Sequence, residues 1–356
     1  MKGNIKMRYD EIELCPLDKT EMGVMQQKID NLAKPIKGLG RLEELADHLA
    51  GIYHTTDFNV SPRKCLVFAA DNGVVHEGVS ASPQKITAIQ AINMMNGHTT
   101  VAALAKAYNC GLQVYDIGIK TDIHSSLVKK YKIRRETGDM LKEPAMTVRE
   151  AKEALQYGFD KGIQSFEEGN QIIAVGELGM GNTTAASAII AAILGKDGKE
   201  VVGRGSNISD ERLAHKIEVV NASLKRAGLK NLRDPDPIQV LSEVGALELG
   251  AMAGAMLAAG AMNKPVLLDG FLSYSAALLA NSIKPSIVNY MIPTHKSKEQ
   301  GSRIVLGALG LDPYIDIDMC VGEGSGAMML LPWLDGIKGI LTNMNTLQEM
   351  DFNFIP

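Results

Sequence analysis

An α/β fold built on a parallel β-sheet, with helices covering both faces, is the fold class that this 356-residue sequence predicts. Its candidate strands are apolar along their whole length, as is typical of strands that are buried on both faces. They alternate along the chain with helical segments, which indicates crossover connections between parallel strands. Each strand ends in Asp, Gly, Glu or His. Because ligands bind beyond the carboxyl ends of such strands, this edge of the sheet is where we expect a site.

The candidate strands fall at residues 64–70, 113–117, 171–175, 265–269 and 286–292. The first, KCLVFAA, has the composition of a buried strand, and Asp71, Asn72 and Gly73 end it. Helices rich in small residues are predicted at 185–194 and 273–280, after the third and fourth strands. The third strand and its helix are joined by the turn 176–184 (GELGMGNTT).

The two ends of the chain read as helical. Residues 19–32 and 42–53 carry apolar residues at three- and four-residue spacing, which predicts two helices separated by a turn. The composition changes near Pro332, and residues 333–356 predict a closing helix followed by a tail.

Composition excludes several classes of function. Hydrophobic residues make up 46% and charged residues 22%, as in ordinary folded proteins, and the net charge of −4 gives no electrostatic reason to bind nucleic acid or an acidic membrane. The four cysteines form no CxxC motif, so we expect reduced thiols in the cytoplasm. Residues 1–10 are polar and lack the apolar core of a signal peptide, and the apolar run 249–262 is too short to cross a membrane. A soluble cytoplasmic protein is therefore expected.

Glu323 stands between glycines in the segment 319–327 (MCVGEGSGA). Glycines allow close approach of the backbone to a ligand. Apolar neighbours would desolvate the carboxylate in part and raise its pKa towards values useful for proton transfer. The alternative is a glycine-rich turn whose Glu323 points into water.

The turn 176–184 combines three glycines with hydroxyl and amide side chains. Free N–H groups at the start of the following helix would make it a phosphate cradle. The alternative is a helix capped by Asn182 or Thr183. Neither GxGxxG nor GxxxxGK[ST] occurs, so a dinucleotide site or a P-loop has no support. A second turn, 203–207 (GRGSN), precedes a charged helix with Lys216, which either neutralises a phosphate or points into solvent.

His295 follows the expected fifth strand beside hydroxyls and lysines, a set that suits an anion, although it could equally be a structural hydrogen bonder. The histidines form no HExxH or other compact ligand set, so we expect no metal and no cofactor. Asp269 has no acidic neighbour. A ribosyl diphosphate normally requires paired acids to hold magnesium, so if this protein transfers a phosphoribosyl group, we expect its donor to carry one phosphate.

Six segments together resemble one family, that of nicotinate-nucleotide:dimethylbenzimidazole phosphoribosyltransferases of cobalamin lower-ligand synthesis. They are KPIKGLGRLEELA (34–46), AADNGVVHEGVSASPQKIT (69–87), GELGMGNTTAASA (176–188), VLLDGFLSYSAALLA (266–280), IPTHKSKEQGSR (292–303) and MCVGEGSGA (319–327). The resemblance covers nearly the whole chain.

The resemblance implies a dimeric enzyme with a Rossmann-like large domain, here residues 61–332. It also implies a small helical domain built from both chain ends, here residues 1–60 and 333–356. The implied reaction moves phosphoribose from nicotinate mononucleotide to 5,6-dimethylbenzimidazole. It gives nicotinate and α-ribazole 5′-phosphate, with inversion at the anomeric carbon.

The resemblance also implies roles for individual residues. Glu323 matches the catalytic glutamate that accepts the benzimidazole N–H proton. The base pocket matches Ser82, Gln90 and Leu178. The phosphate and ribose side matches Glu177, Gly179, Met180, Gly181, Asn182, Thr183, Gly205, Lys216 and Ser297.

Three departures from the family pattern bear on specificity. The chain has Ile36-Lys37-Gly38 where relatives have Pro-Gly-Ser, Asn72 where His is frequent, and Cys320 in place of a common Arg. Some relatives act on phenols or purines, and some pair with an unlike subunit. An active homodimer, a heterodimer with a paralogue and a non-catalytic partner subunit are therefore all considered, and the intact Glu323 and phosphate set favour the active enzyme.

Overall fold

The structure, a computed structural model, describes residues 7–205 and 208–351. The first residues of the expected polar N-terminus, two residues of the turn 203–207 and the end of the expected C-terminal tail lie outside the described residues.

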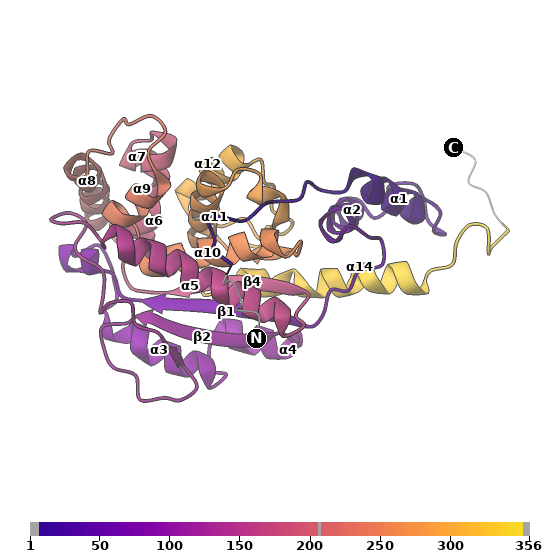
Figure 1. The fold of residues 1–356 in the computed structure, drawn as a ribbon, viewed down its shortest axis with the longest axis horizontal. Coiled ribbons are helices and arrows are strands. Elements are labelled where there is room, and N and C mark those ends of the chain that lie inside the picture. The colour runs from indigo at the N-terminus through magenta and orange to yellow at the C-terminus, as the bar shows by residue number, and fades with distance from the viewer. Residues whose placement is uncertain (1–6, 206–207, 352–356) are drawn as a thin grey trace, which may run out of the picture.

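The described strands form one six-stranded parallel sheet in the order β3-β2-β1-β4-β5-β6. This confirms the predicted fold class, and the strand order is that of a Rossmann-type sheet. Chain order reverses between β1 and β4, which are neighbours in the sheet but far apart in the sequence (Figure 1). The strands are β1 (Arg63–Ala70), β2 (Gly111–Gly118), β3 (Lys129–Lys130), β4 (Ile172–Leu178), β5 (Val266–Leu268) and β6 (Met291–Pro293).

Alternating residues of β1 build the two halves of the core. Leu66 and Phe68 belong to the cluster that includes helices α5 and α10, whereas Cys65 and Val67 belong to the cluster that includes α3 and α4. Because successive side chains of a strand point to opposite faces, an entirely apolar strand needs helices on both sides. Figure 1 shows these helices above and below the strands.

Helices cover the first face in two layers. The layer on the sheet contains α5 (Val148–Glu167), α10 (Leu247–Ala261) and α11 (Phe271–Ile283). Further helices pack on or beside this layer: α6 (Asn182–Leu194), α7 (Gly198–Val201), α8 (Asp210–Arg226), α9 (Pro237–Val244) and α12 (Gln300–Leu309). On the second face lie α3 (Lys85–Met95), α4 (Thr100–Ala107) and α13 (Ser325–Met329).

Helices α5 and α10 cross at glycines. A Cβ on Gly158 would lie 1.8 Å from the carbonyl oxygen of Ala251, and one on Gly254 would lie 1.9 Å from that of Leu155. The two backbones are thus in direct contact, and any side chain at either glycine would force the helices apart. This crossing fixes the helical layer that supports the centre of the sheet.

The chain ends meet beyond one end of the sheet. Helices α1 (Lys19–Asp30), α2 (Arg41–Tyr53) and α14 (Leu331–Asn343) lie together at the narrow end of the molecule (Figure 1). The main chain also joins the two ends, since Ala33 donates its N–H to the Asn345 carbonyl at 2.9 Å. The division into domains at 1–60 with 333–356 and at 61–332 remains a prediction.

Two expectations need correction. Residues 286–292 are not one strand: a 3-10 helix, η2 (Ile287–Tyr290), precedes the short strand β6. A second 3-10 helix, η1 (Gly73–Glu77), follows β1. The third expected strand runs further than residue 175, so Glu177 and Leu178 lie in β4 and not in the turn after it. Among the described residues, no helix is both long and apolar enough to cross a membrane.

Candidate active site

A cavity opens at the carboxyl end of the sheet, where the strand order reverses between β1 and β4. This is the position at which open α/β sheets bind ligands. Its walls come from the segments that follow β1, β4, β5 and β6, and from the loop before α13. The lining includes Ser80, Ala81, Glu177, Leu178, Gly179, Met180, Gly181, Asn182, Thr183, Gly205, Lys216, Asp269, His295, Ser297, Glu299, Cys320 and Glu323.

The loop that carries Glu323 has a left-handed backbone at three successive residues. The φ angles are 78° at Gly322, 65° at Glu323 and 90° at Gly324. A non-glycine residue rarely adopts this region, so bonds from outside must hold Glu323 there. The Glu323 N–H donates to Glu177 Oε1 at 3.3 Å, and the Gly324 N–H donates to Asp269 Oδ2 at 2.9 Å.

The Glu323 carboxylate faces the cavity and is partly buried. Gln90, on α3, donates its Nε2 to Glu323 Oε1 at 3.1 Å. Burial raises the pKa of Glu323, the hydrogen bond from Gln90 opposes that rise, and the negative charge of Asp269 adds to it. The raised pKa confirms the expectation from the loop's apolar neighbours, and the contact with Gln90 contradicts a side chain that only points into water.

Glu177 is a second acid in the same cavity, with 6% of its surface exposed. Its Oε2 accepts from Asn182 Nδ2 at 2.5 Å. Burial, together with the charges of Asp269, Glu248 and Glu323, raises the pKa of Glu177 to about 8. A protonated carboxyl can donate a hydrogen bond, which a carboxylate cannot.

The expected phosphate cradle lies at the start of α6. The N-cap of this helix is Gly181, with no side-chain cap, so capping by Asn182 or Thr183 is wrong. Asn182 instead binds Glu177, and Thr183 accepts a hydrogen bond from Lys216. Because no side chain caps the first amides of α6, the positive end of its helix dipole is available to an anion at the cavity wall.

Lys216 lies beside the start of α6. It is 1% exposed, which contradicts the alternative of a lysine pointing into solvent. Its Nζ donates to Thr183 Oγ1 at 2.9 Å and to the Gly203 carbonyl at 3.1 Å. Burial lowers the pKa of Lys216 to about 8, and the charge of Glu299 opposes that shift. Glu299 itself accepts from the Gly205 N–H at 2.8 Å, so it holds the loop that covers Lys216.

Of the residues expected to line a base pocket, the structure places Leu178 and Gln90 at or beside this cavity. Leu178 lines the cavity at the end of β4. Gln90 does not line it but donates a hydrogen bond to Glu323, which does. Ser82 is not among the lining residues, whereas Ser80 and Ala81 are. The Ser82 N–H donates to Ser80 Oγ at 3.3 Å, so Ser82 contacts a residue that lines the cavity. The segment 80–83 (SASP) contains two serines, and no feature of the sequence indicated which of them lines the cavity.

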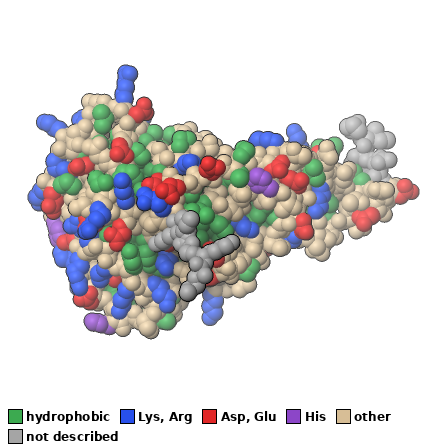
Figure 2. Space-filling view, in the orientation of Figure 1, with side chains coloured by type: hydrophobic (Ala, Val, Ile, Leu, Met, Phe, Trp, Pro, Cys, Tyr) green, Lys and Arg blue, Asp and Glu red, His purple; other side chains and the backbone are tan. Residues whose placement is uncertain are grey.

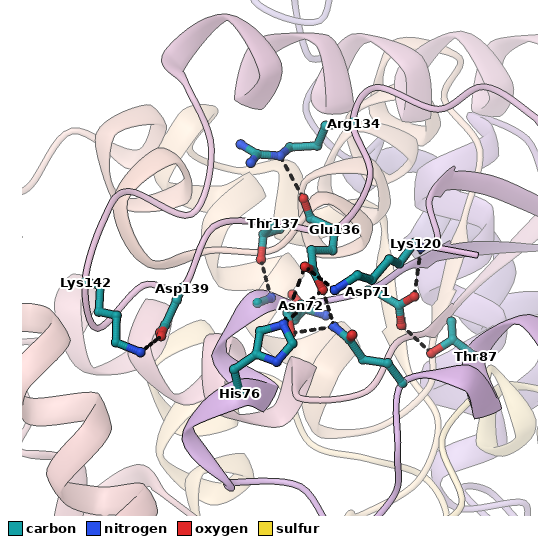
Figure 3. Close-up of polar contacts among 12 residues, drawn as sticks. Asp71, Asn72, His76, Thr87, Lys120, Arg134, Glu136, Thr137, Asp139 and Lys142 are labelled. Atoms are coloured by element: carbon teal, nitrogen blue, oxygen red, sulfur yellow. Dashed lines mark hydrogen bonds and ion pairs between the residues drawn. The ribbon is translucent and has the colours of Figure 1, made fainter. Parts of the chain in front are cut away.

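The segment that carries Ser80 is held in place by a polar network around Glu136 (Figure 3). Glu136 accepts from Gln84 Nε2 at 2.5 Å and from Lys120 Nζ at 2.8 Å. The neighbouring Asp71 accepts from Thr87 Oγ1 at 2.6 Å. These bonds tie the residues after β1 to those after β2 and so fix one wall of the cavity.

Asp269 and His295 both line the cavity at the predicted edge of the sheet, but it was not predicted from the sequence that they lie next to each other. Asp269 is 4% exposed and accepts from the Gly324 and Gly326 amides at 2.9 and 2.7 Å. His295 is 2% exposed, and its Nε2 lies 3.6 Å from Asp269 Oδ1. Within the described residues, neither ring nitrogen of His295 has a hydrogen-bond partner. No group of three potential metal ligands occurs in the same described ranges.

Comparison with known proteins assigns this chain to a family. Residues 14–351 match a family of phosphoribosyltransferases named DBI_PRT. Proteins named nicotinate-nucleotide–dimethylbenzimidazole phosphoribosyltransferase are 43% identical in Escherichia coli and 38% identical in Clostridium perfringens. The matches cover 93% and 94% of this chain and 92% and 91% of the two relatives. The chain belongs to this family.

Solved structures of the family have the same fold. A CobT crystal structure from Thermus thermophilus superposes with a TM-score of 0.89 at 37% identity, covering 94% of this chain and 99% of that one. A structure of the nicotinate-nucleotide–dimethylbenzimidazole phosphoribosyltransferase from the same organism gives 0.88 at 36% identity, covering 95% and 100%. The chain is thus an enzyme of the phosphoribosyltransferase family along nearly its whole length.

The positions at which the chain departs from the family's sequence pattern lie in different parts of the structure. Cys320 is exposed and lines the cavity three positions before Glu323. Asn72 is buried and donates to Glu248 Oε1 at 2.7 Å, behind the cavity wall. Ile36 lies on the surface between α1 and α2, with 63% of its area exposed. Cys320 is therefore the departure that can meet a substrate directly.

The surface in Figure 2 carries acidic and basic side chains interspersed over the described residues of that face. This mixture agrees with the small net charge of the chain.

Proposed function

We propose that this enzyme transfers phosphoribose from nicotinate mononucleotide to 5,6-dimethylbenzimidazole, giving nicotinate and α-ribazole 5′-phosphate in cobalamin nucleotide-loop assembly. The observation that carries the proposal is that an anion site and a partly buried carboxylate face one cavity. Lys216 and the start of α6 form the anion site, and Glu323 is the carboxylate. The names of the relatives supply the two substrates.

The donor binds through its phosphate. The turn at Gly179 and Gly181 leads into the first amides of α6, including that of Thr183, and Lys216 supplies the positive charge beside Thr183. Met180, Gly205 and Ser297 complete this side of the cavity. Asn182 holds Glu177, whose protonated carboxyl donates a hydrogen bond to a ribose oxygen. The anomeric carbon then lies between the cradle and the Glu323 loop.

Glu323 acts as the general base for the acceptor. One ring nitrogen of dimethylbenzimidazole forms a bond to the anomeric carbon while the bond from that carbon to nicotinate breaks. The bonding electron pair leaves with the nicotinate ring nitrogen, which becomes neutral. The new bond makes the benzimidazole ring cationic, so its N–H proton is acidic and passes to Glu323. Attack from the face opposite nicotinate converts the β-linked donor into the α product.

Gln90 and Leu178 orient the acceptor. Gln90 fixes one oxygen of Glu323 and leaves the other for the benzimidazole N–H, while Leu178 offers an apolar surface to the rings. Ser82 supports this wall through Ser80. We place the enzyme in the cytoplasm as a homodimer, with pairing to a paralogue as the alternative assembly.

The test is an assay of nicotinate release by the purified protein, with nicotinate mononucleotide as donor and a panel of bases as acceptors. Release that depends on dimethylbenzimidazole, with an α-linked product by NMR, supports the proposal. Absence of release with every base would assign the chain a non-catalytic role as a partner subunit.

A further inference from the structure

We propose that Asp269 is the positioning residue for Glu323, because its two carboxylate oxygens hold the loop from which Glu323 faces the acceptor. The proposal rests on the function proposed above and adds a residue to it. Asp269 directly follows β5, and its Oδ2 and Oδ1 accept from the amides of Gly324 and Gly326 at 2.9 and 2.7 Å. It thus holds the backbone immediately after Glu323.

The loop needs such support because its own bonds are few. One internal hydrogen bond, from the Ser325 N–H to the Gly322 carbonyl at 2.9 Å, closes the turn. The remaining amides at Glu323, Gly324 and Gly326 are bound by the carboxyl groups of Glu177 and Asp269. Glu323 has a φ of 65°, which side chains rarely adopt. Without Asp269, the backbone would relax towards a common conformation and carry the Glu323 carboxylate away from the acceptor.

The two acids are not interchangeable. Both oxygens of Asp269 are engaged by amides, and the side chain is nearly fully buried. Among the described residues, Glu323 receives a side-chain hydrogen bond from Gln90 on Oε1, and its carboxylate faces the cavity. Asp269 is therefore suited to hold the loop, and Glu323 to meet the substrate.

Asp269 also contributes a negative charge near Glu323. Its negative charge raises the pKa of Glu323 and that of Glu177. Glu323 is faced by Glu177 from β4, by Gln90 from α3 and by Asp269 after β5, with His295 behind Asp269. Removing the charge of Asp269 should thus lower the pKa of Glu323, and Asp269→Glu, which keeps the charge, separates this effect from a change in burial.

The experiment compares Asp269→Asn with Asp116→Asn in the full-length enzyme. Asp116 is the control, because it is also buried at the carboxyl end of a strand and accepts a backbone N–H, that of Ile119 at 2.9 Å, but lies outside the cavity; it differs from Asp269 in also accepting from Lys132 Nζ at 2.7 Å. Deuterium exchange of the segment 319–328 reports on the loop without requiring activity. We expect this segment to exchange about tenfold faster or more in Asp269→Asn, and at the wild-type rate in Asp116→Asn.

Kinetics of nicotinate release then tests the link to Glu323. For Asp269→Asn we expect kcat to fall about tenfold or more, because one of the two amides loses its acceptor. The Michaelis constant for the donor should stay within about threefold of wild type. The acidic limb of the pH–rate profile should move to lower pH. Asp269→Glu keeps the charge with a longer reach, so its kcat should fall while the acidic limb stays in place.

The outcomes separate this proposal from the proposed function. A folded Asp269→Asn enzyme whose segment 319–328 exchanges at the wild-type rate overturns the proposal, and so does an acidic limb that does not move. If Asp269→Asn fails to fold, the exchange and pH profile of Asp269→Glu decide. If the wild-type enzyme releases no nicotinate, the proposed function fails, while the exchange experiment still tests whether Asp269 holds the loop.

Discussion

Gln90 donates its side-chain amide to Glu323 Oε1 at 3.1 Å, across the cavity wall between α3 and the loop before α13. The contact fixes one carboxylate oxygen and directs the other towards the cavity. It also opposes the rise in pKa that burial causes, and a general base must be ionised before the acceptor attacks.

The first prediction concerns Glu323→Gln. This change keeps the size of the side chain and one hydrogen bond but removes the proton acceptor. Loss of a positioned general base lowers rates by about 10²–10⁴-fold, so we expect turnover to fall at least about a hundredfold with donor binding nearly unchanged. The measurement is kcat for nicotinate release. Glu167→Gln, an exposed change on α5, is the control. Activity within a few fold of wild type in the Glu323 variant would remove it from the mechanism.

The second prediction concerns Lys216. Lys216→Ala should raise the Michaelis constant for nicotinate mononucleotide, since a charge-assisted contact contributes about 1.5–3 kcal/mol. Lys216→Met should do the same while filling the buried space, which separates charge from packing. The exposed Lys225→Met on the same helix is the control. An unchanged donor constant in both Lys216 variants would disprove the anion site.

The third prediction concerns the acceptor. With equal dimethylbenzimidazole and p-cresol, the product should be chiefly the benzimidazole riboside. Glu323 and Gln90 offer polar groups to a heterocycle with two nitrogens, and Leu178 offers an apolar wall. Chromatography of the competition reaction measures the ratio. Mostly phenolic riboside would show that the pocket selects a different acceptor.

The fourth prediction concerns stability and pH at Glu248, which is fully buried and binds Asn72. Burial raises the pKa of Glu248 from 4.5 to about 8. Between these values the folded state binds more protons than the unfolded state, so the free energy of unfolding falls as pH rises. Glu248→Gln should remove this contribution, which is at most about 1.4 kcal/mol per pH unit. Urea denaturation between pH 5 and 8 measures the slope. A slope equal to that of wild type would contradict the prediction.

Much of the fold followed from local patterns. The apolar strands at 64–70, 113–117 and 171–175 were predicted because burial on both faces leaves a continuous apolar run. The segment 286–292 (SIVNYMI) was also predicted as a strand but forms η2 before β6. Ile287 in η2 packs against Gly260 of α10, a contact between distant segments that no local pattern encodes.

Those parts of the site whose functional groups lie close together in the sequence were predictable. The glycine loop around Glu323 and the turn before α6 were recognised because each combines its functional groups within a few residues. Asp269 was missed as a partner of Glu323, since its bonds to Gly324 and Gly326 join residues more than fifty positions apart. The burial of Lys216 was equally hidden, because it depends on Gly203 and Thr183 in two other segments.

The buried Lys216 has a consequence for how the enzyme takes up its donor. Burial lowers the pKa of Lys216 to about 8, so near that pH some of the empty sites hold a neutral amine. A phosphate beside Nζ favours the ammonium form, so each such site must draw a proton from solution as it fills. The heat of binding should then depend on the ionisation enthalpy of the buffer. In a weakly buffered solution at pH 8, the medium should become more alkaline as donor binds.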